Sequence, residues 1–210
     1  MLKRKKHEES AITGMEKARH YAESHRKYAR LMYGKFPKYV KSLGAIAKCL
    51  EIGSGPATLT AMVAERNPNL HITAVDISSD MVAVAQEYIE EKKLQDRIHL
   101  IVADAADGSA IGELGQFDLV YSFFSLHHWV DPEKVISNLL KATTEKGVLY
   151  IHDFRRVWWV RCLPLDTGEI NGMRAAYTSH EIGALLRKLD ARQYEIRKAF
   201  PLFQSVIVTK

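Results

Sequence analysis

The stretch Glu51-Ile52-Gly53-Ser54-Gly55-Pro56-Ala57 joins a short apolar segment to a helical pattern through two glycines. Glycine lets a backbone turn sharply and approach a ligand, and the first turn of the following helix offers free N–H groups. The stretch is not a dinucleotide fingerprint, because Thr58 stands where G-x-G-x-x-G has its third glycine. It is not a P-loop either, because no Gly-Lys-Ser or Gly-Lys-Thr follows. We therefore expect a ligand-binding turn between a strand and a helix.

Around this turn, short apolar or β-branched runs alternate with helical patterns, which is typical of a parallel sheet with helices on both faces. The last two runs are joined by only two residues, too few for a parallel crossover, so we expect them to pair antiparallel. The sequence thus predicts a doubly wound α/β fold with a mostly parallel, seven-stranded sheet and an antiparallel C-terminal strand. The expected strands are 48–52, 72–76, 99–103, 117–122, 147–153, 193–199 and 202–209.

Several residue types mark where helices should begin. Pro56 and Pro132 suit the first position of a helix, and Ser78 and Asp131 are good N-cap residues. Thr178 with Glu181 has the spacing of a capping box.

Composition bounds the class of protein. The 210 residues are 47% hydrophobic and 26% charged, which is ordinary for a globular domain. The net charge of +5 invites a nucleic-acid or membrane-surface partner, but residues 1–9 account for +2 of it and we expect the remainder to be spread thinly. No apolar run approaches the roughly 18 residues of a membrane span, and no apolar segment follows the basic start as in a signal peptide. Cys49 and Cys162 form no disulfide framework or zinc motif, so we expect a reducing, cytoplasmic location.

Two acidic residues extend the site beyond the glycine turn. Asp76 ends the second expected strand, 21 residues after Gly55, and Asp104 follows the third. The carboxyl ends of neighbouring parallel strands form the crevice in which open α/β sheets bind ligands, and a carboxylate there can accept hydrogen bonds from ribose hydroxyls. One acidic residue at a strand end is often only a helix cap, but two in series beside a glycine turn indicate a binding site.

These residues resemble the class I S-adenosylmethionine-dependent methyltransferases, with a Rossmann-like fold, over residues 48–210. The terminal antiparallel strands also fit that family and argue against a nicotinamide enzyme. The segment Ser125-Leu126-His127-His128-Trp129-Val130-Asp131-Pro132 is similar to the Leu-His-His segment of the small-molecule branch that includes ubiquinone and menaquinone methyltransferases. Two departures are Ala57, where many members have a third glycine, and Lys141–Gly147, which replaces a Leu-Lys-Pro-Gly-Gly turn.

The resemblance implies S-adenosyl-L-methionine as cofactor, S-adenosyl-L-homocysteine as product, and a set of cofactor-binding residues. Glu51, Gly53 and Gly55 would line the methionine end, and Asp76 would hold the ribose with Ile77 beside the adenine. Asp104 and Ala105 would contact the adenine ring and amine. The expected cofactor set is completed by Tyr21, Met81 and Ser122.

His127 and His128 are the candidate catalytic residues, because histidine titrates near neutral pH and the pair follows the fourth expected strand. A general base is needed only if the acceptor carries a proton that must leave. The alternative is that one histidine orients the loop or caps local structure. We expect no metal site, because adjacent histidines on an extended segment point in different directions and no third ligand is evident.

Residues 1–47 form an N-terminal tail and a helical segment in front of the domain at 48–210. Tyr21, His25, Tyr28 and Met32 fall on one face of this helix, which Gly34 and Pro37 end. The face either packs on the domain or forms a lid over a pocket, with Tyr28 then touching substrate.

The segment 154–177 is long for a connection, so we expect it to shape the acceptor pocket. Its arginines and tryptophans, with Arg155 and Trp158 as the candidate substrate-binding residues, suit an anionic or aromatic small molecule. They would also suit an unpaired base with its phosphates, or an ordinary interface patch.

The sequence therefore predicts an enzyme that methylates a small molecule. A tRNA or rRNA methyltransferase is the first alternative, made less favoured by the absence of an Asn-Pro-Pro-Tyr or Asp-Pro-Pro-Tyr motif after the fourth strand. The second is a non-catalytic module that binds a protein partner. The accepting atom and the oligomeric state stay open.

Overall fold

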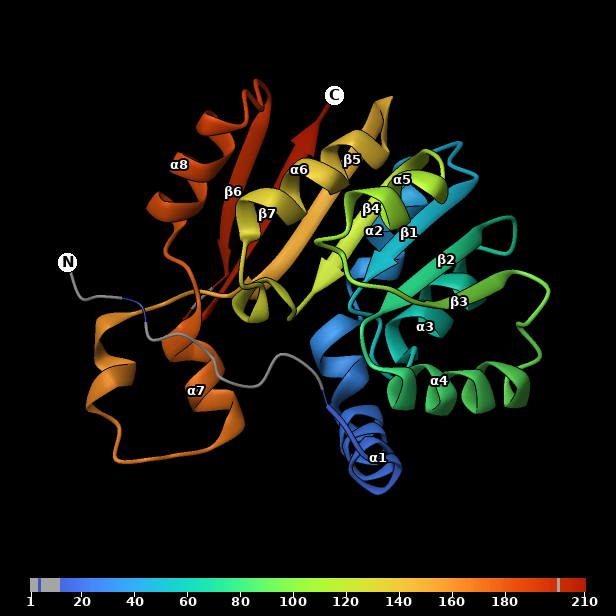
Figure 1. The fold of residues 1–210 in the computed structure, drawn as a ribbon, viewed down its shortest axis with the longest axis horizontal. Helices are drawn as coiled ribbons and strands as arrows, with labels where there is room; N and C mark the ends of the chain where they lie inside the picture. The colour runs from blue at the N-terminus through green and yellow to red at the C-terminus, as the bar shows by residue number, and fades with distance from the viewer. Residues whose placement is uncertain (1–3, 5–11, 200) are drawn as a thin grey trace.

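The computed structural model describes residues 4, 12–199 and 201–210, and it has a single seven-stranded sheet (Figure 1). The strand order is β3-β2-β1-β4-β5-β7-β6, with parallel pairing from β3 to β5 and antiparallel pairing of β7 with both β5 and β6. The predicted fold class is therefore confirmed. The strands are β1 Lys48–Ile52, β2 His71–Asp76, β3 Ile98–Val102, β4 Phe117–Phe123, β5 Thr143–Phe154, β6 Tyr194–Ala199 and β7 Phe203–Thr209.

Helices cover both faces of the sheet, because the central strands β1 and β4 have buried side chains on both sides. One face packs against α1 to α4, and the other against α5, α6 and α8. The α-helices are α1 Met15–Tyr33, α2 Phe36–Ser42, α3 Thr58–Arg66, α4 Ser79–Glu91, α5 Gly108–Glu113, α6 Pro132–Ala142, α7 Gly168–Ala175 and α8 Ser179–Lys188. Among the described residues, no helix is both long and apolar enough to cross a bilayer.

The helix starts confirm most of the predicted caps. Ser78 and Asp131 each accept a backbone N–H from the first turn of their helix, and Thr178 and Glu181 form a complete capping box. The prediction for Pro56 is wrong, since α3 begins at Thr58. The reason is that Gly55 and Ala57, on either side of Pro56, have left-handed backbone angles, with φ of 52° and 54°, which a right-handed helix does not tolerate.

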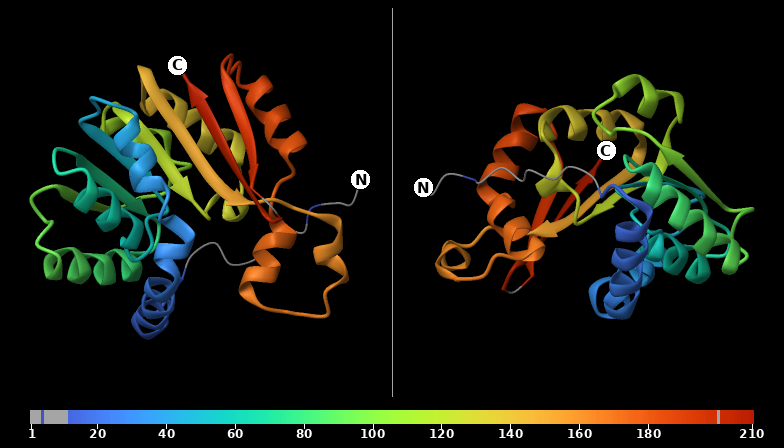
Figure 2. Two further views of the ribbon diagram at one scale, coloured as in Figure 1. Left: turned by 180° about the vertical axis from the view of Figure 1, so that it is seen from behind. Right: turned by 60° about the horizontal axis from the view of Figure 1, so that its bottom comes forward.

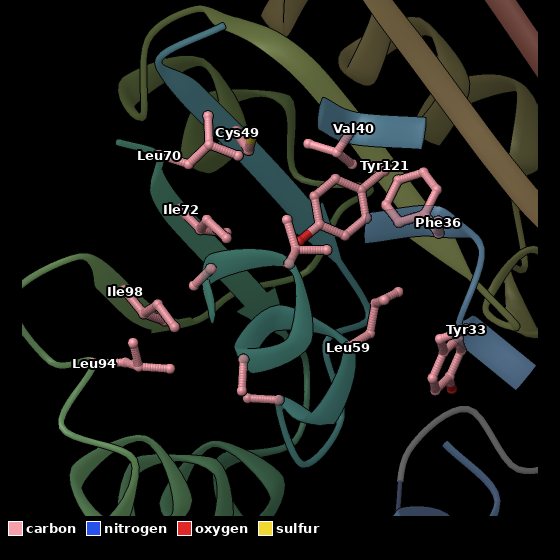
Figure 3. Packing of buried hydrophobic residues seen from close by; sticks show 14 of the residues in the cluster. Tyr33, Phe36, Val40, Cys49, Leu59, Leu70, Ile72, Leu94, Ile98 and Tyr121 are labelled. Atoms are coloured by element: carbon pink, nitrogen blue, oxygen red, sulfur yellow. The ribbon is translucent and has the colours of Figure 1, made fainter. Parts of the chain in front are cut away.

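Part of the N-terminal segment belongs to the main core. Tyr33, Phe36 and Val40 are at most 4% exposed and pack with Tyr121 of β4 and Leu59 of α3 (Figure 3). Earlier in α1, small residues pack on α4, with Ala18 and Ala22 against Met81 and Val84.

At the other side of the sheet, the segment between β5 and α8 contains the short 3-10 helix η2, Trp158–Cys162, and α7. In Figures 1 and 2, α1 and the η2–α7 segment both project beyond the edge where the parallel strands end. The predicted site residues at the carboxyl ends of β1, β2 and β4 therefore lie at the edge that these two projections flank.

Candidate functional site

The glycine turn after β1 is fixed on one side by the protein itself. The N–H groups of Gly53 and Ser54 both donate to the carbonyl of Val75 in β2, at 2.8 and 3.1 Å. Gly53 has φ of 70°, and a Cβ there would lie 2.1 Å from the Ser125 hydroxyl. Glycine is therefore required at position 53 by both backbone angle and space.

The other side of the turn is open and polar. A Cβ built on Gly55 would meet no atom within 4 Å. Among the described residues, the buried hydroxyls of Ser54 and Thr58 have no hydrogen-bond partner, and Ala57 gives α3 no side-chain cap. Buried polar groups and a bare helix N-terminus are costly unless something pairs with them. The turn thus fits a ligand that brings its own polar or anionic group, as the amino-acid end of S-adenosylmethionine does.

Asp76 ties the two neighbouring loops together. One carboxylate oxygen accepts the N–H of Gly55 at 2.8 Å, and the other accepts the N–H of Ser78 at 2.9 Å. Burial raises the pKa of Asp76, and the hydrogen bonds from Ser78, Gly55 and Ile77 oppose that rise. A carboxylate has about four positions for accepting hydrogen bonds, so these three leave one, and the predicted contact with a ribose hydroxyl is compatible with this structural role.

The loop after β3 sits beside that of β2. The carbonyl of Asp76 accepts the N–H of Ala103 at 3.0 Å, which brings Asp104 next to it along the edge. Asp104 caps its own turn through Ala106, and Asn138 of α6 holds the carbonyl of Ala105. Ile77 is exposed. The contacts of Ile77, Asp104 and Ala105 with a cofactor stay a prediction.

Glu51 and Ser122 are buried within the sheet. The Glu51 carboxylate accepts the hydroxyls of Thr60 and Tyr121, at 2.6 and 2.9 Å, and burial raises its pKa to about 7. Ser122 donates to the carbonyl of Ile52 at 2.9 Å and is fully buried. Both side chains hold the strands beneath the glycine turn, so a direct contact with the cofactor stays a prediction.

The N-terminal helix places Tyr21 close to the site. Its ring stacks on His25 and is partly exposed. Burial raises the pKa of Tyr21 to about 12, and the negative charges of Asp76 and Glu169 act in the same direction. Asp76 is the last residue of β2 and Glu169 lies in the first turn of α7, so the charges of both flanks of the site act on the Tyr21 hydroxyl. Met81, by contrast, packs against α1 and is only 2% exposed. This packing explains its burial, so no ligand is needed to cover it.

His127 forms a buried pair with Asp153 of β5. The Nδ1 atom is 2.7 Å from one carboxylate oxygen, and the other oxygen accepts the backbone N–H of His127 at 2.8 Å. The Nε2 atom faces α7, where a Cβ on Gly172 would lie 2.9 Å away. The ring of His128 packs on that of His127, with centroids 4.1 Å apart. Sequence reasoning missed Asp153, although an acidic residue ending the fifth expected strand was a usable signal.

The three predicted substrate residues are not joined to one another by any hydrogen bond or ring contact among the residues described. Arg155 donates to the carbonyl of Pro201 at 2.8 Å, so it braces the link between β6 and β7. Tyr28 and Trp158 are largely exposed. Arg4 of the N-terminal tail reaches α7 and the short 3-10 helix η1, Leu126–His128, instead, donating to the carbonyls of Ala175 and His127.

A cluster of aromatic rings lies at the same edge as His127, and the sequence did not single it out. Phe124 packs on Tyr33, His152, Phe154 and Phe203, with ring centroids 5.2 to 6.1 Å apart. Phe154 also packs on the His127 ring. These rings come from α1, β5, β7 and the residue after β4, so they are brought together only by the fold. They provide apolar surface beside the histidine pair.

Among the described residues, no group of three or more histidine, cysteine or carboxylate side chains is placed to hold a metal ion.

Comparison with known proteins shows that part of this chain is similar to methyltransferases. A methyltransferase domain matches residues 50–149. The demethylmenaquinone methyltransferase of Thermus thermophilus is 27% identical over 141 residues, covering 62% of each chain. The first three curated relatives are matched over 26%, 62% and 36% of their own lengths, so the chain spans less than two thirds of each.

Solved structures share the whole fold. A S-adenosylmethionine-dependent methyltransferase structure from Methanococcus maripaludis, itself assigned by similarity, has a TM-score of 0.76 at 21% identity, over 97% of this chain and 96% of that one. The plantazolicin methyltransferase, solved in complex with S-adenosylhomocysteine, has a TM-score of 0.71 at 16% identity, over 92% and 88%. The glycine turn, the strand-end carboxylates and the reversed β7 thus accompany similarity to a methyltransferase domain over residues 50–149 and a fold shared with S-adenosylmethionine-dependent methyltransferase structures.

Proposed function

We propose that the chain transfers the methyl group of S-adenosylmethionine to a small-molecule acceptor. The observation that carries this proposal is the glycine turn, in which the buried Ser54 and Thr58 hydroxyls have no hydrogen-bond partner in the described part of the chain and lie beside the open side of Gly55. A pre-formed site with unpaired polar groups gains their hydrogen bonds only when its ligand arrives.

The chemistry asks little of the protein beyond alignment. When bound, the cofactor supplies a sulfonium methyl group, which an acceptor atom attacks in line with the departing sulfur. Holding two reactants in that geometry can lower the barrier by about 7 to 11 kcal/mol. The protein's part is to fix the cofactor against the ends of β1 to β3 and to exclude water from the acceptor.

The aromatic cluster favours an apolar or ring-containing acceptor. Phe124, Phe154 and Phe203 offer ring faces beside His127, and aromatic rings pack well on other flat rings. A quinone-like acceptor fits that surface, as for the Thermus thermophilus relative. Arg155, which braces Pro201, and the exposed Trp158 would then shape the entrance.

His127 is the proposed general base if the acceptor loses a proton. Asp153 is hydrogen-bonded to Nδ1, and its carboxylate would stabilise the imidazolium that forms when His127 takes the proton. Full activity of a His127→Gln variant would contradict this role. His128, whose ring packs on that of His127, would orient it.

Calorimetry with S-adenosylmethionine and S-adenosylhomocysteine tests the cofactor site. Ser54→Ala should weaken binding of both about tenfold, since one hydrogen bond is worth roughly 1 kcal/mol or more to a charged group. The folded chain should lose no stability, because the hydroxyl has no partner there. Asp76→Ala should also weaken binding more than tenfold, but with a loss of stability, because Asp76 holds two backbone N–H groups.

The acceptor is found by incubating the chain with methyl-labelled cofactor and fractionated cell extract, with metabolites separated from RNA. Label in an apolar metabolite fraction is the expected result. No cofactor binding by the unmodified chain would refute the enzyme, and label confined to RNA would refute the small-molecule acceptor. A reducing, cytoplasmic compartment suits the free thiols of Cys49 and Cys162 and belongs to this proposal.

A further inference from the structure

The positive charge of the chain is concentrated at its N-terminal end. Beyond the first eleven residues, the remaining net charge of +3 is not spread thinly as expected. Residues 12–47 hold eight lysines and arginines against two glutamates, whereas residues 48–210 hold 18 cationic against 21 acidic side chains. The domain that carries the cofactor site is therefore slightly acidic, and α1 and α2 are strongly basic.

Helix α1 is packed in an unusual way, with its small residues inward and large apolar residues outward. Ala18, Ala22 and Ala29 are buried, whereas Leu31 is 87% and Tyr28 is 62% exposed. At 100° per residue, Leu31 lies on the side of the helix opposite the alanines. A soluble helix normally buries such residues, so this outward face indicates a partner.

Cations surround the exposed apolar residues of α1. Lys27, Arg30, Lys35 and Lys38 all lie within seven residues of Leu31 and are exposed. Within the part of the chain that the structure describes, none of these four takes part in an ion pair, whereas Arg19 pairs with Glu87 of α4. Folding therefore leaves these four charges for another partner.

The η2–α7 segment carries a second exposed apolar surface on the same edge of the molecule. Trp158 is 72% and Leu165 is 52% exposed, with Trp159 and Arg161 beside them. Figure 1 and both views of Figure 2 place this segment and α1 as separate projections beyond the carboxyl ends of the parallel strands. We call Tyr28, Leu31, Trp158 and Leu165 the edge residues.

We propose that this edge docks on an anionic lipid surface, with the edge residues entering the headgroup region and the four cations of α1 and α2 contacting lipid phosphates. Basic helices with exposed leucine and aromatic residues bind membrane interfaces in two ways at once. Their apolar side chains leave water, and their cations are attracted to anionic headgroups. Docking would turn the entrance of the site toward the lipid, where an apolar acceptor of the kind proposed above resides. The docking itself does not depend on that activity.

Lipid is favoured over RNA by the kind of apolar residue exposed. RNA binding uses cations for phosphates and aromatic rings for bases, and the tryptophans alone would satisfy it. Leu31 and Leu165 have no such use, whereas aliphatic side chains gain free energy on leaving water for the lipid boundary.

Flotation of the full-length chain with vesicles tests the proposal. One set contains phosphatidylcholine with phosphatidylglycerol, and the other contains phosphatidylcholine alone. We expect at least tenfold stronger binding to the anionic vesicles, with a blue shift of tryptophan fluorescence. The triple variant Lys27→Glu, Arg30→Glu, Lys35→Glu should abolish this preference. Its matched control reverses three exposed cations elsewhere, Lys141→Glu, Lys146→Glu and Lys198→Glu, and should bind as the unmodified chain does.

Apolar variants separate insertion from simple charge attraction. Leu31→Ser should weaken vesicle binding severalfold and Leu31→Phe should preserve it, with circular dichroism unchanged in both because the side chain is exposed. Equal binding to both vesicle sets, or no effect of Leu31→Ser, would overturn the proposal. So would stronger binding to mixed tRNA than to anionic vesicles at the same salt concentration, or a dimer that Leu31→Ser dissociates.

Discussion

At the scale of single residues, the two glycines of the turn have different tasks. Gly53 is enclosed, and its missing side chain makes room for Ser125, whereas Gly55 faces open space. Both have left-handed backbone angles. Ala57 adopts the same left-handed region, so this turn accommodates one alanine there at a cost of roughly 1 to 2 kcal/mol.

Alanine substitutions should therefore separate folding from binding. Gly55→Ala should lower the free energy of unfolding by about 1 kcal/mol, from backbone angle alone, and should weaken cofactor binding because its Cβ enters the ligand space. Gly53→Ala should cost roughly 2 kcal/mol or more, because the new Cβ also meets Ser125. Urea denaturation and calorimetry measure both quantities. Equal losses of stability in the two variants would contradict this assignment.

Glu51 predicts a dependence of stability on pH. Burial raises the pKa of its carboxyl from an ordinary 4.5 to about 7 in the folded chain. The folded state thus binds the proton more tightly than the unfolded state, so this contribution is fully present below pH 4.5 and is lost as the pH rises through 7. Glu51→Gln keeps an oxygen for Thr60 and Tyr121 without the charge.

Comparing the unmodified chain with the Glu51→Gln variant isolates the contribution of the Glu51 carboxyl to stability. Relative to the unmodified chain, Glu51→Gln should gain stability on the order of 3 kcal/mol between pH 4.5 and pH 8. Denaturant unfolding at a series of pH values gives the difference directly. Parallel stability profiles for the two chains would show that Glu51 titrates normally.

At the scale of elements, the sequence predicted correctly those features that depend on interactions within a few residues. The strand positions and the caps at Ser78, Asp131 and Thr178 follow from side-chain alternation and side-chain-to-backbone hydrogen bonds within a few residues. The start of α3 escaped prediction because it depends on backbone angles that Asp76 and Val75 impose from the neighbouring strand. The Asp153–His127 pair escaped for the same reason, since its members lie 26 residues apart and meet only across β4 and β5.

The capping box of α8 offers a test at this scale. Thr178→Ala removes an N-cap hydroxyl that accepts the N–H of Glu181 at 3.2 Å and donates to its carboxylate at 3.0 Å. We expect a loss of about 1 kcal/mol in the free energy of unfolding. Thr167→Ala, at the start of the more exposed α7, is the matched control. Its hydroxyl is 3.4 Å from the N–H of Ile170, so it should cost at most half as much.

At the scale of the whole molecule, the first 47 residues are less separable than their sequence indicated. The amphipathic pattern of α1 predicted a helix, but it could not distinguish a lid from a core element. In the structure the segment does two things: Tyr33, Phe36 and Val40 complete the core, and burial together with the charges of Asp76 and Glu169 at the site raises the pKa of Tyr21. The aromatic cluster, drawn from α1, β5, β7 and the residue after β4, likewise depends on tertiary packing and had no signal along the chain.

Truncation distinguishes the two roles. A chain that begins at Lys48 loses Tyr33, Phe36 and Val40 from the core, each worth about 1.5 to 3 kcal/mol when fully buried. That total is comparable with the 5 to 15 kcal/mol that stabilises a typical domain, so we expect this chain to be largely unfolded by circular dichroism. A chain that begins at Ile12 keeps α1 and α2 and should fold in one cooperative transition, although it loses the contacts of Arg4 with Ala175, His127 and the Tyr177 ring. If the chain beginning at Lys48 instead folds and binds S-adenosylmethionine, then residues 12–47 are an accessory whose function lies wholly outside the core.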